Sequence, residues 1–201
     1  MRSGIDFDNT IACYDGVFHA AALERGLIPS NLARDKHSVR DYLNSAGRAD
    51  VFTALQGHVY GARMDLASPF PGVADFVTSA RKAGHDLFIV SHKTRVPILG
   101  AKHDLHGAAR GFLTARGLVG EGRIDPSHVL FELTKEAKVD RIGSLRCDAF
   151  IDDLPEIFAL AAFPRATRPI LFDPADQFSD VKFDRRASWA EISAEFCHEH
   201  V

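Results

Sequence analysis

Two aspartates placed two residues apart, Asp6 and Asp8, are the side chains of this chain best suited to do chemistry. They lie in the run Gly4-Ile5-Asp6-Phe7-Asp8-Asn9-Thr10, where a short extended stretch leads into a turn. Side chains at positions i and i+2 of a strand point to the same side, so both carboxylates can converge on one point. Adjacent carboxylates repel each other away from water, and Mg²⁺ suits oxygen ligands of this kind. One carboxylate can then act as a nucleophile and the other can move a proton.

The same run also fits a structural turn built from Asx and N-cap residues, and only the remainder of the chain separates the two interpretations. From Ser68 onward, short apolar runs alternate with amphipathic segments of helical spacing. We expect strands at 4–8, 87–90, 129–131, 149–151 and 170–172, and helices at 73–80, 105–113, 134–145, 155–162 and 189–196. This alternation predicts an α/β fold, a Rossmann-like open parallel sheet with helices on both faces.

Polar side chains collect where three of these strands end. Asp6 and Asp8 follow the first, Ser91 follows the run 87–90, and Asp152-Asp153 end the strand at 149–151. Ligands of open α/β sheets bind at this edge, so the three strand ends predict one acidic site that is ready to hold a metal ion.

Two lysines near the start of the helix at 134–145 are candidates for an anion contact. Lys135 lies nearer the helix start, where an anion is favoured, and Lys138 is one turn further on. We therefore favour Lys135 and keep Lys138 as the alternative. Glu156 either joins the metal ligands or complements the dipole of its own helix.

These positions resemble, in order and roughly in spacing, the four motifs of the haloacid dehalogenase (HAD) superfamily. Motif I resembles Asp6–Thr10, motif II Ser91, motif III Lys135 and motif IV Asp152-Asp153. The resemblance extends over about residues 4–175. It implies a Mg²⁺-dependent hydrolase in which Asp6 attacks phosphorus to form an aspartyl-phosphate, while Asp8 protonates the leaving oxygen and later activates water.

The resemblance also implies the remaining ligands. Mg²⁺ would be held by Asp6, by the backbone carbonyl of Asp8 and by the pair Asp152 and Asp153, with Asp153 the expected direct ligand. Phosphoryl oxygens would be held by Ser91 and Lys135, and Thr10 would order the turn.

The second aspartate bears on the class of reaction. Dehalogenases of this superfamily lack an acid at the position of Asp8, because a halide needs no proton when it leaves. Asp8 therefore favours hydrolysis of a small phosphomonoester, such as a sugar phosphate or a nucleotide. Two alternatives remain open: a phosphotransferase or phosphomutase on the same fold, and a non-catalytic protein that binds a phosphorylated ligand.

Residues 15–66 are predicted to be mostly helical and occupy the position of a helical cap in this superfamily. We expect a catalytic core at 1–14 and 67–201 and a small helical cap at 15–66 that selects the substrate. Tyr60 and Arg63 in the cap, and Lys93 and Arg95 just after motif II, are the candidate substrate contacts; each also fits an ordinary surface position.

Composition sets outer limits on function. The 201 residues are 46% hydrophobic with a formal net charge of −3, which gives no basic surface for a nucleic acid polymer. Apolar stretches are too short to span a membrane. Three widely spaced cysteines, Cys13, Cys147 and Cys197, fit neither a metal motif nor a disulfide framework. We therefore expect a cytoplasmic protein, and the resemblance implies that its partner is a small phosphorylated metabolite; the oligomeric state is left open.

Overall fold

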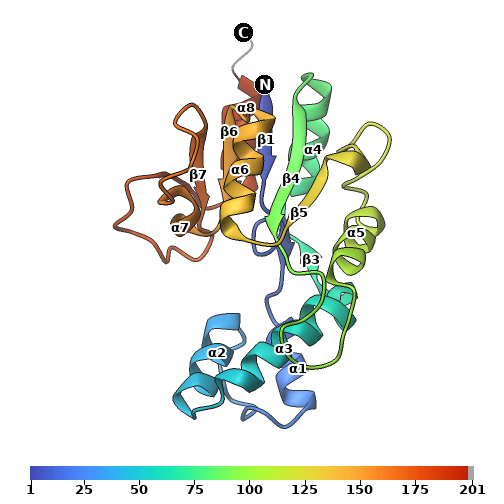
Figure 1. Ribbon diagram of the computed structural model, residues 1–201, viewed down its shortest axis with the longest axis vertical. Coiled ribbons are helices and arrows are strands. Elements are labelled where there is room, and N and C mark those ends of the chain that lie inside the picture. The colour runs from blue at the N-terminus through green and yellow to red at the C-terminus, as the bar shows by residue number, and fades with distance from the viewer. Residues whose placement is uncertain (199–201) are drawn as a thin grey trace. The chain divides into compact units, whose positions relative to one another are not determined.

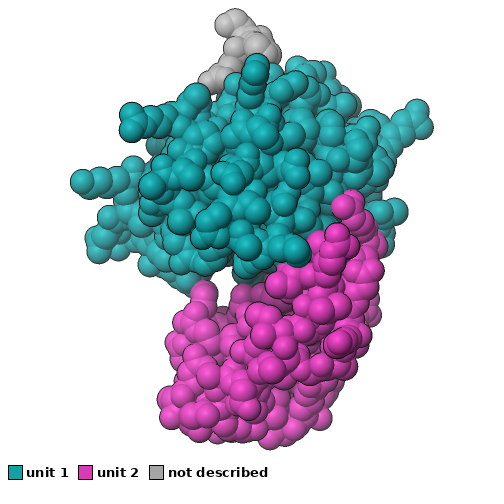
Figure 2. All heavy atoms as spheres, viewed as in Figure 1, with its two compact units in different colours: residues 1–12, 69–93, 113–201 teal, residues 13–68, 94–112 magenta. Residues whose placement is uncertain are grey.

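The computed structural model describes residues 1–198 and divides them into two compact units. Unit 1 contains residues 1–12, 69–93 and 113–198, and unit 2 contains 13–68 and 94–112; Figure 2 colours each unit separately. No helix in the described part of the chain combines the length and hydropathy needed to cross a membrane.

Unit 1 is built on a six-stranded parallel sheet (Figure 1). The strand order is β5-β4-β1-β6-β7-β8, with bounds Val129–Glu132, Asp86–His92, Arg2–Ile5, Ala149–Asp152, Arg168–Phe172 and Asp184–Arg186. Helix α6 (Lys135–Leu145) covers one face, and α4 (Val73–Lys82) and α8 (Trp189–His198) pack together on the other. The predicted Rossmann-like α/β fold is confirmed.

Some element boundaries differ from those expected. The first strand covers Arg2–Ile5 instead of 4–8, so both motif I aspartates follow the strand. Helix α7 (Pro155–Phe158) is one turn long and does not continue to residue 162. Strand β8 was not predicted, because its sequence Asp-Arg-Arg carries no apolar signal.

The central strand β1 is less apolar than its position suggests, and Gly4 explains why. Gly4 is buried, and a β-carbon on it would lie 2.4 Å from the Phe150 ring and 3.2 Å from the Cys147 sulfur. Phe150 and Cys147 belong to a core cluster that includes Val90, Ile142 and Leu171. The neighbouring strand thus supplies the apolar volume that β1 lacks.

Unit 2 contains the predicted helices of the 15–66 block: α1 (Val17–Glu24), α2 (Lys36–Ser45) and α3 (Ala49–Ala62), followed by a single 3-10 turn, η1 (Met64–Leu66). Helix α5 (Leu105–Ala115) begins in this unit and ends in unit 1. Two short strands, β2 (Ala12–Cys13) and β3 (Ser68–Pro69), pair where the chain enters and leaves the helical block.

The segment 94–112 belongs to unit 2, which the expected boundary at residue 66 did not include. A β-carbon on Gly57 of α3 would lie 2.4 Å from Pro97, and one on Gly61 would lie 2.5 Å from His103. The two glycines therefore leave room for this segment to lie directly against α3.

Within the described side chains, Cys13 and Cys147 are free thiols, and the side chain of Cys197 lies outside them. Burial raises the pKa of Cys147 to about 11, so this thiol is an inert packing group.

Candidate active site

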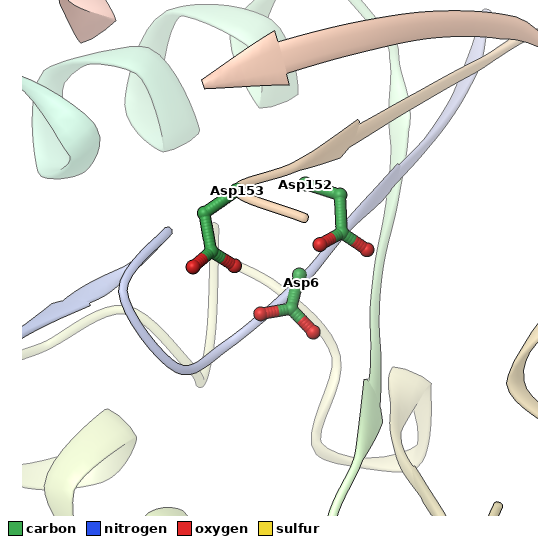
Figure 3. Close-up of side chains that lie close together, drawn as sticks. All are labelled: Asp6, Asp152 and Asp153. Carbon is green, nitrogen blue, oxygen red and sulfur yellow. The ribbon is translucent and has the colours of Figure 1, made fainter. Parts of the chain in front are cut away.

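Three carboxylates meet at the carboxyl edge of the sheet in unit 1. Asp6 directly follows β1, Asp152 ends β6 and Asp153 comes next, and each offers an oxygen within 4.8 Å of the others (Figure 3). Strands β1 and β6 are neighbours, and the Asp6 backbone N–H donates to the Ile151 carbonyl at 2.9 Å. Side chains of Asp6 and Asp152 are buried. Adjacency of the two strands thus brings together residues that are about 146 positions apart in the sequence.

Lys138 is the cation at the centre of this cluster. Its side chain is only 2% exposed, and its ammonium donates to Asp6 Oδ1 at 2.6 Å and to Asp152 Oδ2 at 2.5 Å. Burial alone would lower the pKa of Lys138, but the charges of Asp152 and Asp6 outweigh burial and hold the pKa above its usual value. Lys138 is therefore permanently charged at neutral pH.

The Asp152 carboxyl has a raised pKa. Burial is the largest cause, the charge of Asp6 adds to it, and Lys138 opposes it. Burial therefore disfavours the charged form of Asp152, and a cation held at this edge would favour it.

The expectation that Lys135 reaches this edge in place of Lys138 is wrong. Lys135 forms an ion pair with Glu156, and the two side chains are 40% and 57% exposed. A helical side chain leans toward the N-terminus of its helix, so the lysine that reaches the sheet edge must start about one turn inside the helix. The N-cap of α6 is Thr134, whose hydroxyl accepts from the Ala137 N–H at 3.1 Å.

Asp8 and Lys93 form a second charged pair close by. The Lys93 ammonium lies 2.7 Å and 3.0 Å from the two Asp8 oxygens, and the side chains are 2% and 18% exposed. Lys93 was expected to contact substrate; its pairing with Asp8 has no local sequence signal, because the two residues are 85 positions apart.

The turn after Asp8 is fixed by the backbone. Asn9 has a φ of 59°, and the Phe7 carbonyl accepts from the N–H groups of Ile11 and Ala12. The buried indole of Trp189, in α8, donates to the Thr10 carbonyl at 3.0 Å. Sequence reasoning missed this contact, which ties the C-terminal helix of unit 1 to the motif I turn.

The remaining predicted phosphate contacts lie near the same edge. The Thr10 hydroxyl is 3.5 Å from Asp153 Oδ1, at the outer limit of a hydrogen bond. Ser91 is buried in β4, the neighbour of β1. Their contact with a phosphoryl group stays a prediction.

The other three predicted substrate residues belong to unit 2. Tyr60 accepts a hydrogen bond from the Lys36 ammonium at 2.8 Å, Arg63 pairs with Glu24, and Arg95 is exposed. Their role stays a prediction as well.

The residues present fit a hard divalent cation. Three carboxylates face one point, and carboxylate oxygens are the ligands that Mg²⁺ prefers. The four carboxylates of Asp6, Asp8, Asp152 and Asp153 exceed the two ammonium groups of Lys93 and Lys138 by two charges. A single divalent ion would neutralise that excess.

Comparison with known proteins gives a fold and no close relative. No protein-family model matches the chain, and no curated protein matches its sequence. Solved structures match over nearly the whole chain. YfnB, a HAD hydrolase from Bacillus subtilis bound to magnesium, has a TM-score of 0.55 at 12% identity and covers 97% of both chains. A protein described as a predicted phosphoglycolate phosphatase from Haemophilus somnus 129PT has a TM-score of 0.54 at 14% identity, covering 96% of each.

A third match is described as a dehalogenase, with a TM-score of 0.57 at 12% identity over 96% of each chain. The chain therefore has the fold of the HAD-superfamily hydrolases, as its motifs predict. Because this fold hosts proteins described both as phosphatases and as dehalogenases, the class of reaction must be argued from the site itself.

Proposed function

We propose that this protein is a Mg²⁺-dependent hydrolase of the HAD superfamily that cleaves a small phosphomonoester through an aspartyl-phosphate on Asp6. The observation that carries the proposal is the placement of Asp6: its carboxylate contacts the Lys138 ammonium at 2.6 Å and has an oxygen within 4.8 Å of oxygens of Asp152 and Asp153. A nucleophile needs this balance, since a bare carboxylate would repel an anionic ester.

Asp8 favours an ester over a halide. Ester cleavage leaves an alkoxide that must gain a proton, and a carboxyl group two residues from the nucleophile can supply it. A halide leaves as a stable anion and would make no use of Asp8. The side chain of Asp8 is 18% exposed, more than those of Asp6 and Asp152, so it is accessible to an incoming substrate and to water.

The reaction proceeds in two balanced steps. First, an Asp6 oxygen bonds to phosphorus, the ester P–O bond breaks, and the leaving oxygen keeps the electron pair and takes a proton from Asp8. Water then attacks phosphorus and gives its proton to Asp8, while the bond to Asp6 breaks and its electron pair returns to the carboxylate. Bound Mg²⁺, held by Asp6, Asp153 and Asp152 directly or through water, would neutralise charge on the phosphoryl oxygens. Lys138 and Ser91 would hold these oxygens in line.

The test is phosphate release from a panel of sugar phosphates, nucleoside monophosphates and p-nitrophenyl phosphate, with Mg²⁺ and with a chelator. We expect Mg²⁺-dependent release that Asp6→Asn abolishes and that Asp140→Asn, an exposed position on α6, leaves unchanged. Transfer of the phosphoryl group to an added sugar in place of water would identify a phosphotransferase. Binding of phosphate without turnover would support the non-catalytic alternative.

A further inference from the structure

The ion pair between Lys93 and Asp8 is held too firmly to be an incidental surface contact. The Lys93 ammonium contacts both oxygens of one carboxylate, and its side chain is as completely buried as that of Lys138. A buried ammonium is costly unless it is paired, so the contact with the Asp8 carboxylate helps to compensate for the burial of Lys93.

Both residues of the pair are held by backbone contacts. The Lys93 N–H donates to the Glu132 carbonyl at 2.8 Å, which extends the pairing of β4 with β5, and its ammonium lies 5.3 Å from the centre of the Phe7 ring. Asp8 forms a backbone bridge with Ala12 across the motif I turn. The pair therefore fixes the direction of the Asp8 carboxylate with little freedom on either side.

We propose that Lys93 is a positioning residue that orients the Asp8 carboxylate for the hydrolysis of the aspartyl-phosphate; this inference rests on the proposed function. In that step Asp8 accepts a proton from the attacking water, so its carboxylate must be aimed at the water. Two hydrogen bonds from one ammonium hold it in a fixed orientation. This role replaces the expectation that Lys93 binds substrate, because its ammonium is already engaged by both Asp8 oxygens.

A role of Lys93 in orienting Asp8 can be distinguished from a role in binding substrate with p-nitrophenyl phosphate as the substrate. The leaving group of this ester needs no proton. Formation of the aspartyl-phosphate then does not require Asp8, whereas its hydrolysis does. If Lys93 acts through Asp8, Lys93→Met leaves the first turnover within about threefold of wild type and slows steady-state turnover by about 10- to 100-fold. Rapid mixing of the Lys93→Met protein with this substrate and Mg²⁺ should show a burst of nitrophenolate equal to the enzyme concentration. A slow steady-state phase, limited by hydrolysis of the aspartyl-phosphate, should follow the burst.

Lys93→Arg should restore much of the steady-state rate, since it keeps a cation that can contact both oxygens. Lys82→Met, at an exposed position, is the matched control and should behave as wild type. A raised KM with unchanged kcat, an equal slowing of burst and steady state, or no change at all would overturn the positioning role.

The double variant Asp8→Asn/Lys93→Met keeps the test decisive even if the single variant fails to fold, because it leaves no unpaired charge between the two positions. If Lys93 acts through Asp8, the double variant retains the residual rate of Asp8→Asn within about twofold, as groups that work as a unit do. A further large loss would overturn the inference. Absence of Mg²⁺-dependent release by wild type would instead refute the proposed function, so the two failures are distinguishable.

Discussion

Replacing Lys138 by methionine should destabilise unit 1 far more than the same change at Lys135. The Lys138 side chain is 2% exposed and its partners Asp6 and Asp152 are 6% and 0% exposed, so the variant would leave two buried carboxylates without their ammonium. Removing one partner of a buried pair costs about 3–5 kcal/mol. The Lys135–Glu156 pair is largely exposed, and such pairs contribute about 0–1 kcal/mol.

Thermal unfolding in chelator is the assay, followed by circular dichroism. At about 2–4 °C per kcal/mol for a chain of this size, Lys138→Met should lower the Tm by roughly 6–20 °C and Lys135→Met by no more than a few degrees. Mg²⁺ should raise the Tm of Lys138→Met more than that of wild type, because the metal supplies the missing positive charge. Equal shifts for the two variants, or a Lys138→Met protein as stable as wild type, would refute the buried-pair reasoning.

Three further predictions concern the elements that support the site. Gly4→Ala should lower the free energy of unfolding in urea by about 1–3 kcal/mol, because the new methyl group meets Phe150; a neutral result would contradict the close approach. Asp35→Ala should cost about 1 kcal/mol in the same assay, since it removes the N-cap of α2. Burial alone would raise the pKa of Glu195, but the hydrogen bonds and charges of Arg168 and Arg186 together outweigh burial and lower it. The stabilising contribution of Glu195 should therefore be present above its ordinary pKa of 4.5 and be lost as the pH falls through its lower pKa in the folded protein. In that acidic range, the free energy of unfolding of Glu195→Gln should depend less on pH than that of wild type.

The location of the site could be predicted because it follows from topology. Apolar runs of parallel strands are visible in the sequence, and polar residues at their carboxyl ends must share one edge of the sheet. Asp6 and Asp152 meet because β1 and β6 are neighbours in the sheet, although the two strands are not consecutive along the chain.

The choice between the two lysines could not be made from spacing. Lys135 and Lys138 lie three residues apart and so lie on nearly the same side of the helix. The two lysines differ in their distance from the start of the helix. Lys138 begins one turn inside the helix, and its side chain points back toward the helix N-terminus, where it reaches the carboxylates. Preference for the position nearest the helix start was therefore the wrong criterion.

Contacts between residues far apart in the chain could not be predicted from the sequence either. Glycine is unfavourable inside a helix, and nothing in the sequence shows that Gly57 and Gly61 leave room for Pro97 and His103 to lie against α3. In the same way, the pairing of Asp8 with Lys93 needs the three-dimensional neighbourhood of β1 and β4.

The central claim is that Asp6 becomes phosphorylated during turnover. The most direct measurement is mass spectrometry of the peptide containing Asp6, after acid quench of the enzyme with p-nitrophenyl phosphate and Mg²⁺. We expect one phosphoryl group on Asp6, in a larger fraction of the Lys93→Met protein and absent from Asp6→Asn. Phosphate release by wild type with Asp6 unmodified at every quench time, or a phosphoryl group on another residue, would contradict it.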